Sequence, residues 1–576
     1  LKDRLSLKLL MQNNNVRIKY PKIEGTAQLF TDEFINYLLA LHDHFSDRIK
    51  AIRTVRQQTL TEAHSKGIAS LALPLSEINT GKWVVDTVPT ELKSPGIEIS
   101  GPAGIANMFI NALNPGPEGE RAVGYLDDDE DSGGHSFKDT INSAINRLEA
   151  SEGTLSYEDP KRERVYKLEP GNLPFFMHRE RGLHLDEHEV TIDGQSISAT
   201  LLSTALTLFH VGRSQMRQGK GVYFYLPKLE SVYEVEIYKD LFDLSKEILH
   251  LDSNSTIKAI ILVESLPAVF RMENMLHALG QYGAGLNAAR WDLKASILEY
   301  ILPDPKSVWP DRFEVDIKTT KFMSDIFRRL VAICLKREAV AIGGMATALP
   351  SRDEEVNQIA ADSIKSDKEW EARQGFLRGW SAHIYHMKTA SDPFKEWWGT
   401  GWQPTIEMSN PDNYPVHIET PEGKITSEGT IRNIRTIIEY VEGWLNGRGA
   451  KGIDSMEDQD GKRPSLMEDL ATARISVGQV AQRILHHVSC QTTGVIHTPQ
   501  VVKEMVDNAT TNILEIRKSQ LKESDFIDTE IRYQIARKVC LKWIENYTEL
   551  NFRSLGSYTQ EDLKRIGLEA DALQKK

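Results

Sequence analysis

Hydrophobic residues recur at helical spacing in the first part of the chain. Phe34, Tyr37, Leu38, Leu41 and Phe45 fall at i, i+3, i+4, i+7 and i+11, which places them on one face of a helix. Thr31-Asp32-Glu33 puts acidic residues in the first turn, where they complement the helix dipole. We therefore predict a helical segment over residues 1–94.

From about residue 95 the pattern changes to short β-rich runs that alternate with amphipathic helices. The strand candidates are Ala122–Tyr125, Val190–Ile192, Val222–Leu226, Thr256–Val263 and Val340–Ile342. Leu202–Gln218 and Tyr233–Leu249 are typical of helices between them. Polar clusters follow several strands, as at Asp127–Asp131 and Glu264. Because active sites of (β/α)8 barrels form there, we predict a TIM barrel over residues 95–391.

A stretch rich in Pro, Gly and Trp, Asp392–Pro415, predicts a connection to a further domain. The helices expected after it are Ile431–Leu445, Met467–His487, Thr498–Val506 and Glu530–Asn546. The fold class is thus α/β: a TIM barrel with a helical N-terminal segment and a helical C-terminal domain over residues 392–576.

The amino-acid composition excludes several classes of protein. A formal net charge of −13 argues against a general nucleic-acid binder. Three widely spaced cysteines exclude a disulfide framework and favour a reducing compartment. No stretch is apolar enough to suggest a membrane span. We expect a cytoplasmic protein; peroxisomal import stays open, although the C-terminal Gln574-Lys575-Lys576 is not a peroxisomal signal.

Two motifs do not lie in the secondary structure that their usual binding functions require. Gly447–Gly452 matches GxGxxG but follows a helical pattern instead of a strand, so it indicates a helix stop and not a dinucleotide site. His184 and His188 are spaced like a metal pair, yet they precede the strand pattern Val190–Ile192. Histidines four apart on a strand do not converge as they would on a helix.

The acids at strand ends are better candidates. Glu264 follows a strand, and Asp292 lies about one βα repeat further along, so the two could occupy adjacent strands. Two carboxylates whose remaining positions are left to water and substrate suit Mg²⁺ rather than zinc. Acids at strand ends are also common helix caps, and spacing alone leaves that alternative open.

Several segments together resemble malate synthase, and in particular its shorter A-type members. They are Arg181–His184, Tyr223–Ser231, Glu264–Phe270, Gly285–Asn287 with Arg290-Trp291-Asp292, Gly343–Met345 and Leu466–Asp469. They occur in the family's order, and the similarity extends from about residue 30 to residue 510.

The resemblance implies a condensation of acetyl-CoA with glyoxylate, followed by hydrolysis to malate and CoA. By similarity, Asp469 is the base that removes a methyl proton from the thioester, and Arg181 is the fixed positive donor for the enolate oxygen. Mg²⁺ on Glu264 and Asp292 would be the Lewis acid for the aldehyde.

Further residues receive supporting roles from the same resemblance. Arg290 and Trp291 belong to the segment expected to bind glyoxylate through backbone amides, and Asp128 and Glu130 are expected to orient Arg181 or the metal-bound waters. Met-Glu-Asp occurs twice, ending at Asp458 and at Asp469. We assign the base to the second, since the Ala471-Thr472-Ala473 run after it continues the family pattern.

The chain departs from the family pattern near the site. The departures are Glu180, Leu183, Leu293, Leu377, Ile384 and Arg474. Glu180 conflicts most with the expected role of Arg181, because a carboxylate beside Arg181 could pair with it in place of the enolate.

These departures leave two alternatives open: a divergent homologue that uses another acyl-CoA and 2-oxo acid, and a non-catalytic homologue that binds an acyl-CoA or a protein. The oligomeric state is unknown.

Overall fold

The N-terminal part is built around one long helix. The computed structural model describes residues 17–251, 255–453, 463–553 and 555–573. Helix α3 (Asp32–Lys66) buries the predicted apolar face, and the Thr31 hydroxyl accepts a hydrogen bond from the Phe34 amide at 3.2 Å. It packs against α7 (Ala199–Leu206) and α9 (Val232–Ile248), two helices of the central domain.

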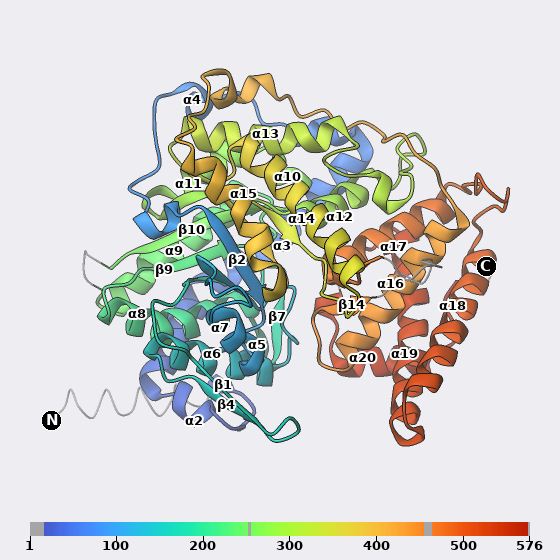
Figure 1. The fold of residues 1–576 in the computed structure, drawn as a ribbon, viewed down its shortest axis with the longest axis horizontal. Helices are drawn as coiled ribbons and strands as arrows, with labels where there is room; N and C mark the ends of the chain where they lie inside the picture. The colour runs from blue at the N-terminus through green and yellow to red at the C-terminus, as the bar shows by residue number, and fades with distance from the viewer. Residues whose placement is uncertain (1–16, 252–254, 454–462, 554, 574–576) are drawn as a thin grey trace.

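The central domain is a closed barrel of eight parallel strands (Figure 1). In chain order, which is also their order around the barrel, these are β2 (Gly96–Gly101), β3 (Gly124–Asp128), β6 (Phe175–Arg179), β9 (Val222–Leu226), β10 (Ile257–Val263), β11 (Gly283–Ala288), β12 (Val340–Ala346) and β13 (Arg378–Ser381). Because β13 pairs with β2, the sheet has no free edge. The predicted (β/α)8 barrel is confirmed.

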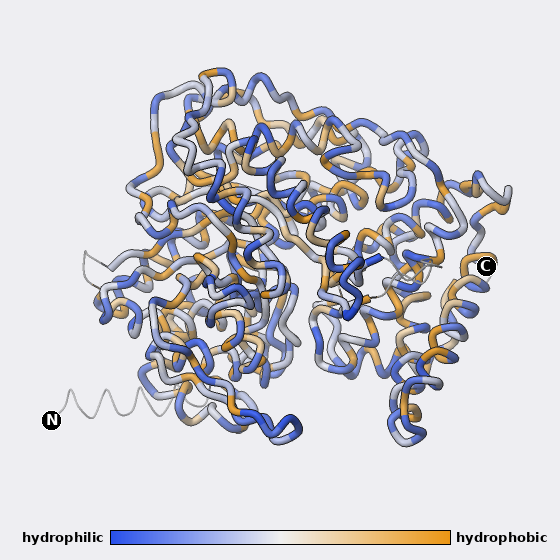
Figure 2. The backbone as a smooth tube through the Cα atoms, viewed as in Figure 1, coloured by the Kyte–Doolittle hydropathy of each residue, from blue (hydrophilic) through white to orange (hydrophobic). Residues whose placement is uncertain are grey.

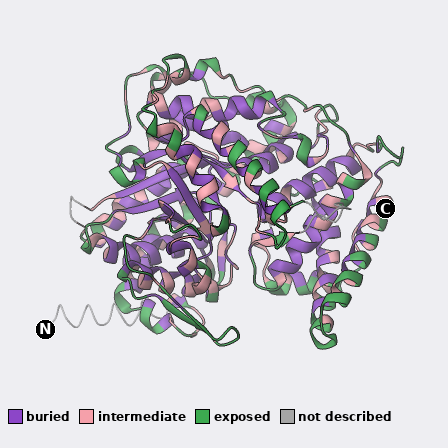
Figure 3. Cartoon of the chain, in the orientation of Figure 1, coloured by how far each residue is buried: buried purple, intermediate pink, exposed green. Residues whose placement is uncertain are grey.

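Helices surround the barrel, so its strands are buried on both faces. They include α5 (Ala106–Leu113), α6 (Phe137–Glu152), α8 (Arg213–Arg217), α10 (Leu266–Val269), α11 (Met272–Ala278), α12 (Arg290–Ile301), α13 (Lys321–Lys336), α14 (Glu354–Gln374) and α15 (Met387–Gly399), with short α2 (Thr26–Leu29) and α4 (Glu77–Thr80). Every residue of β9 and β10 is buried (Figure 3). None of the helices in the described residues has the length and apolar character of a membrane span.

Strand predictions succeeded where the runs are continuously apolar. Val222–Leu226 is β9, and Thr256–Val263 and Val340–Ile342 overlap β10 and β12. Val190–Ile192 is a strand but lies outside the barrel. It ends β7 (Asp186–Ile192), which pairs antiparallel with β8 (Gln195–Ser198) and β1 (Ile18–Lys19) in a separate small sheet. A further hairpin, β4 (Ser156–Asp159) and β5 (Arg164–Lys167), also lies outside the barrel.

The C-terminal helices form a second hydrophobic core on one side of the barrel (Figure 1). They are α16 (Ser427–Leu445), α17 (Leu470–Leu485), α18 (Pro499–Gln520), α19 (Glu523–Thr548) and α20 (Gln560–Leu568). Hydrophobic and hydrophilic residues alternate along them, as expected of amphipathic helices (Figure 2). Helix α17 also packs against α12 of the barrel, so it joins the two parts.

Several element boundaries differ from the prediction, and two of these differences affect the connections between the domains. The connection expected from Asp392 begins later, because α15 continues through Pro393 to Gly399. The helix expected from Met467 begins at Leu470, since β15 (Leu466–Glu468) first pairs antiparallel with β14 (Lys451–Ile453). Gly447 has a φ of 74° directly after α16, which confirms the helix stop in place of a dinucleotide loop.

The segment before α17 is fastened to the barrel. The Met467 amide donates to the Thr347 carbonyl at 2.9 Å, and the Leu349 amide donates to the Ser465 carbonyl at 2.9 Å. Residues 347–349 directly follow β12, at the carboxyl end of the barrel. These backbone bonds therefore hold Asp469, the next residue but one after Met467, at the mouth of the barrel.

Candidate active site

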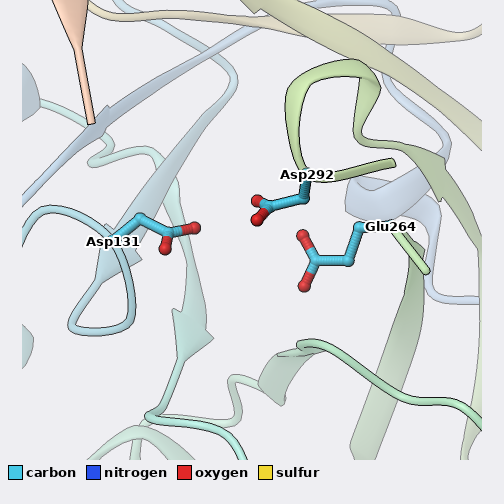
Figure 4. Close-up of side chains that lie close together, drawn as sticks. All are labelled: Asp131, Glu264 and Asp292. Atoms are coloured by element: carbon cyan, nitrogen blue, oxygen red, sulfur yellow. The ribbon is translucent and has the colours of Figure 1, made fainter. Parts of the chain in front are cut away.

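Three buried carboxylates meet at the carboxyl ends of the barrel strands. Glu264 directly follows β10, Asp292 lies in the first turn of α12 after β11, and Asp131 lies in the loop after β3. One ligand oxygen of each lies within 4.8 Å of the others, and the three side chains point toward one another (Figure 4). The adjacent position predicted for Glu264 and Asp292 is thus observed, whereas Asp131 was not predicted as their partner.

Two buried cations lie among these acids. Arg179, the last residue of β6, places Nη2 at 2.5 Å from Asp131 and 3.0 Å from Glu264. Lys228 places Nζ at 3.0 Å from Asp131 and 3.2 Å from Asp292. Its backbone amide also donates to Glu264, from a residue whose φ of 54° turns the chain toward the carboxylate.

The cluster carries more negative than positive charge. Asp128 lies 3.5 Å from Arg179, and Glu130 lies 3.8 Å from Lys228. Together with Asp131, Glu264 and Asp292, they make five carboxyl groups around these two cations. Burial, together with the charges of Asp292 and Asp131, raises the pKa of Glu264 to about 8, although Lys228 and Arg179 oppose the shift. This excess charge and the oxygen-only donors fit a hard divalent cation, as predicted for Mg²⁺.

Asp469 faces the same cluster from the C-terminal domain. It is the N-cap of α17, where its carboxylate accepts a hydrogen bond from the Thr472 amide at 3.2 Å. Burial and the charges of Asp131 and Asp292 raise its pKa to about 8. The competing Asp458 lies outside the described residues.

The predicted arginine is turned away from the cluster. The Arg181 guanidinium donates to Glu187 at 2.8 Å and to Thr140 at 3.1 Å, which satisfies it elsewhere. The chain leaves the strand after Arg179, so the alternation that would bring both arginines inward is lost. Sequence reasoning missed Arg179, because β6, the strand that it ends, was not among the predicted strands.

Asp128 and Glu130 shape the acidic loop. Asp128 accepts hydrogen bonds from the Ser132 hydroxyl at 2.6 Å and from the Asp131 amide at 3.1 Å. Glu130 accepts one from the Gly182 amide at 2.5 Å, beside Arg181. These bonds shape the loop that carries Asp131. The predicted orientation of Arg181 or of metal-bound waters by Asp128 and Glu130 remains a prediction.

Arg290 and Trp291 begin α12 beside Asp292. Arg290 lies 3.5 Å from Asp316, and Lys294 lies over the Trp291 ring at 4.4 Å from its centre, so both side chains are occupied away from the carboxylates. The amides of a first helical turn have no partner within their helix. The expected recognition of a carboxylate by amides of residues 290–292 remains a prediction.

Most of the residues that depart from the family pattern do not contact the carboxylate cluster. Glu180 pairs with Arg147 at 3.3 Å and with Thr207, so the expected competition for Arg181 is wrong. Leu183 and Leu293 are buried in the apolar core. Leu377 and Ile384 are partly buried against that core. His188 is exposed. His184 is partly buried and its Nε2 lies 3.8 Å from Glu130, but neither histidine belongs to the group formed by Asp131, Glu264 and Asp292. Only Arg474 among the departures contacts one of them, Asp292, at 3.2 Å.

A cavity of about 320 Å³ opens beside the carboxylates. It is lined by α3, by the barrel mouth and by the C-terminal part, and it includes Glu264 and Lys228. Its wall is rich in cations, namely Arg53, Arg56, Arg474 and Arg553. A ligand in this cavity would therefore meet the carboxylate cluster at one end and positive charge along its sides.

These features define a barrel protein whose acidic mouth is completed by a carboxylate from a separate helical domain. Comparison with known proteins gives the family. A model described as malate synthase, TIM barrel domain, matches residues 175–416, and one described as malate synthase, C-terminal, matches residues 424–559. The chain belongs to the malate synthase family, whose members are acyltransferases.

Individual relatives agree over most of their length. Malate synthase A of Escherichia coli is 32% identical over 88% of this chain and 91% of its own. Malate synthase of Myxococcus xanthus is 34% identical over 81% of this chain and 83% of its own. A glyoxysomal malate synthase of Gossypium hirsutum is 29% identical over 93% of this chain and 92% of its own. Similarity thus covers both the barrel and the helical domain.

Proposed function

We propose that this enzyme condenses acetyl-CoA with glyoxylate and hydrolyses the resulting malyl-CoA to malate and CoA. The observation that carries the proposal is the convergence of Asp131, Glu264 and Asp292 opposite Asp469, a base candidate from another domain. The family match favours this activity over another acyl-CoA and 2-oxo acid pair or a non-catalytic binder.

Asp131, Glu264 and Asp292 would hold Mg²⁺, and the remaining coordination positions would be left to water and substrate. When bound, the ion polarises the aldehyde oxygen of glyoxylate. First-turn amides of α12, next to Asp292, are suitable donors for the glyoxylate carboxylate. This arrangement would present the aldehyde carbon to the cavity.

The Asp469 carboxylate would remove a proton from the methyl group of acetyl-CoA. The C–H electron pair then forms the enolate, whose carbon attacks the aldehyde carbon to make the new C–C bond. The aldehyde oxygen becomes an alkoxide and takes up the proton that Asp469 removed, which regenerates the carboxylate. Water attacks the thioester carbonyl of the product, the C–S bond breaks, and CoA leaves as the thiol. A raised pKa suits Asp469 to this task, because a stronger base removes a weakly acidic proton more readily.

Arg179 is the residue that we propose to stabilise negative charge on the reacting oxygens, in place of Arg181. Its guanidinium lies among the carboxylates, and its Nε has no hydrogen-bond partner within the described residues although it is buried. A buried donor without a partner is costly unless a ligand satisfies it. Charge stabilisation of this kind contributes strongly because the donor is fixed beforehand.

The cavity beside the carboxylates would admit acetyl-CoA with its uncharged thioester end toward Glu264. Arg53 and Arg553, the more exposed arginines of its wall, would meet the negatively charged phosphates of CoA. Because the whole chain is acidic, anionic substrates need such a local positive region. We also propose a cytoplasmic location, which the three unpaired, buried cysteines support through the reducing conditions they imply.

The function is tested by measuring free CoA thiol released from acetyl-CoA with and without glyoxylate and Mg²⁺. We expect release that needs both, and a loss of at least about 100-fold in Asp469→Asn, which keeps the shape but removes the base. Asp458→Asn is the matched control and should retain activity. Release by the intact chain that is independent of glyoxylate would argue for a thioesterase instead.

A further inference from the structure

Arg474 links the two halves of the site. It lies on α17, little more than one helical turn after Asp469, and it is nearly buried. Its Nη1 donates to Asp292 Oδ1 at 3.2 Å. Within the described residues, it is the only cation of the C-terminal part that forms an ion pair with any of the three clustered carboxylates.

The guanidinium is held in place from its other side. Arg474 Nη2 contacts both carboxylate oxygens of Glu299 at 2.8 Å, and Nε donates to Oε1 at 3.1 Å. The Tyr547 hydroxyl donates to the same Oε1 at 2.6 Å. Glu299 belongs to α12, the helix whose first turn carries Asp292, and Tyr547 belongs to α19. The network therefore joins the barrel helix to two helices of the C-terminal core.

Two opposite effects on a bound cation can be expected from such an arginine. Its positive charge near Asp292 would repel a metal ion. Glu299 largely neutralises that charge, since it pairs with Arg474 through several hydrogen bonds. What remains is a directed hydrogen bond to Oδ1 of Asp292, an oxygen that Lys228 Nζ also approaches at 3.2 Å from the barrel side. Oδ2 lies on the side of Arg179. We therefore expect the gain in metal affinity from orienting the Asp292 carboxylate to exceed the loss from repulsion between Arg474 and the metal ion.

We infer that Arg474 is a positioning residue for the cation site: it fixes the carboxylate of Asp292 and ties the helix that carries Asp469 to that carboxylate. The inference rests on the proposed function only in taking Asp292 as a metal ligand. Because Arg474 and Asp469 share α17, docking of this helix would complete the cation site and deliver the base together. Metal affinity would then depend on a residue outside the barrel.

The test measures Mg²⁺ binding by isothermal titration calorimetry, without substrates, on the full chain. We expect Arg474→Gln to weaken Mg²⁺ binding by about 10- to 100-fold, as loss of a ligand-orienting partner does. Arg474→Lys should recover little, because an ammonium group cannot bridge Glu299 and Asp292 in the same way. Tyr547→Phe, which leaves Arg474 and Asp292 intact, should weaken binding in the same direction by a smaller factor.

Arg483→Gln is the matched control. Arg483 lies on the same helix and pairs with Asp311 at 2.7 Å, away from the carboxylate cluster. Its loss should lower the melting temperature and leave the Mg²⁺ affinity unchanged. Tighter or unchanged Mg²⁺ binding in Arg474→Gln would overturn the inference, and if that variant does not fold, unchanged binding in Tyr547→Phe would do so.

The calorimetry separates this inference from the proposed reaction. A wild-type chain that binds Mg²⁺ but releases no CoA would contradict the function and leave the Arg474 result to be judged by itself. A wild-type chain that binds no Mg²⁺ would overturn the inference, whatever the activity assay shows.

Discussion

At the residue scale, the site combines groups that the sequence identifies with groups that only the fold reveals. Glu264 could be predicted because it follows a strand pattern, and Asp292 because it lies about one βα repeat further along; both match a family motif. Asp131 and Arg179 could not be distinguished from their neighbours. Asp131 is one of five consecutive acids, and Arg179 lies two residues before Arg181. Which member of such a run points inward depends on where the strand ends, and that boundary is the least certain part of a sequence prediction.

The two arginines should behave differently when replaced. Arg179→Gln should lower kcat by about 100- to 1000-fold, because it removes a fixed donor from the reacting oxygens. Arg181→Gln should mainly destabilise the fold, by about 3 kcal/mol, because it leaves the buried Glu187 without its partner. Steady-state kinetics and urea unfolding of both variants check this. The reverse pattern would return the catalytic assignment to Arg181.

The raised pKa of Asp469 predicts the acid side of the pH–rate profile. A general base must be ionised, so kcat/KM should fall as pH drops through the pKa of this carboxyl group. Bound Mg²⁺ would offset the charges of Asp131 and Asp292, which are among the causes that raise this pKa to about 8. At saturating Mg²⁺ we therefore expect a midpoint below 8 but above the ordinary value for Asp. An acid limb that is unchanged in Asp469→Glu would contradict the assignment.

At the scale of elements, strand composition decided what could be predicted. The apolar runs of β9 and β10 were recognisable, whereas β2, β11 and β13, which contain glycine, were not predicted. β6 was also missed, although it has no glycine, because it ends in the polar residues His178 and Arg179. Glycine lowers strand propensity, yet these segments are held by pairing on both sides. The pairing of β14 with β15 was also missed, since strands this short carry almost no periodic signal.

The backbone contact between β15 and the loop after β12 should matter for catalysis. Met467→Pro removes the amide that donates to Thr347, and it should loosen the placement of Asp469. We expect kcat to fall by at least about 10-fold, as small misplacements of a reacting group do. Met467→Ala keeps the amide and is the control. Equal activity of the two variants would show that this contact does not position the base.

At the scale of the whole molecule, the site lies where two hydrophobic cores meet. The barrel supplies the carboxylate cluster, and the helical domain supplies Asp469 and Arg474. Sequence patterns predicted both parts, but not that the N-terminal helix α3 would also line the cavity beside the cluster. Contacts between distant segments depend on how helices pack, which periodicity does not encode.

Metal binding should affect the stability of the whole chain. A ligand present at 100 times its Kd stabilises the folded state by about 2.7 kcal/mol, so Mg²⁺ should raise the melting temperature. Because the pKa of Glu264 is raised from 4.5 to about 8 in the folded state, the metal-free fold loses stability as pH rises between these two values, and the loss is complete above the higher one. At pH 9 without metal, Glu264→Gln should therefore melt at or above the wild-type temperature. With Mg²⁺, differential scanning fluorimetry should show an increase only for the wild type; an equal increase in both would place the metal elsewhere.

The central claim is that this chain makes a carbon–carbon bond between acetyl-CoA and glyoxylate at the mouth of the barrel. It is tested most directly by nuclear magnetic resonance with acetyl-CoA carrying ¹³C in the methyl group, in the presence of glyoxylate and Mg²⁺. We predict that the label appears in the methylene carbon of malate, and that Asp469→Asn abolishes this signal. Label found only in free acetate would show thioester hydrolysis without condensation and would contradict the account.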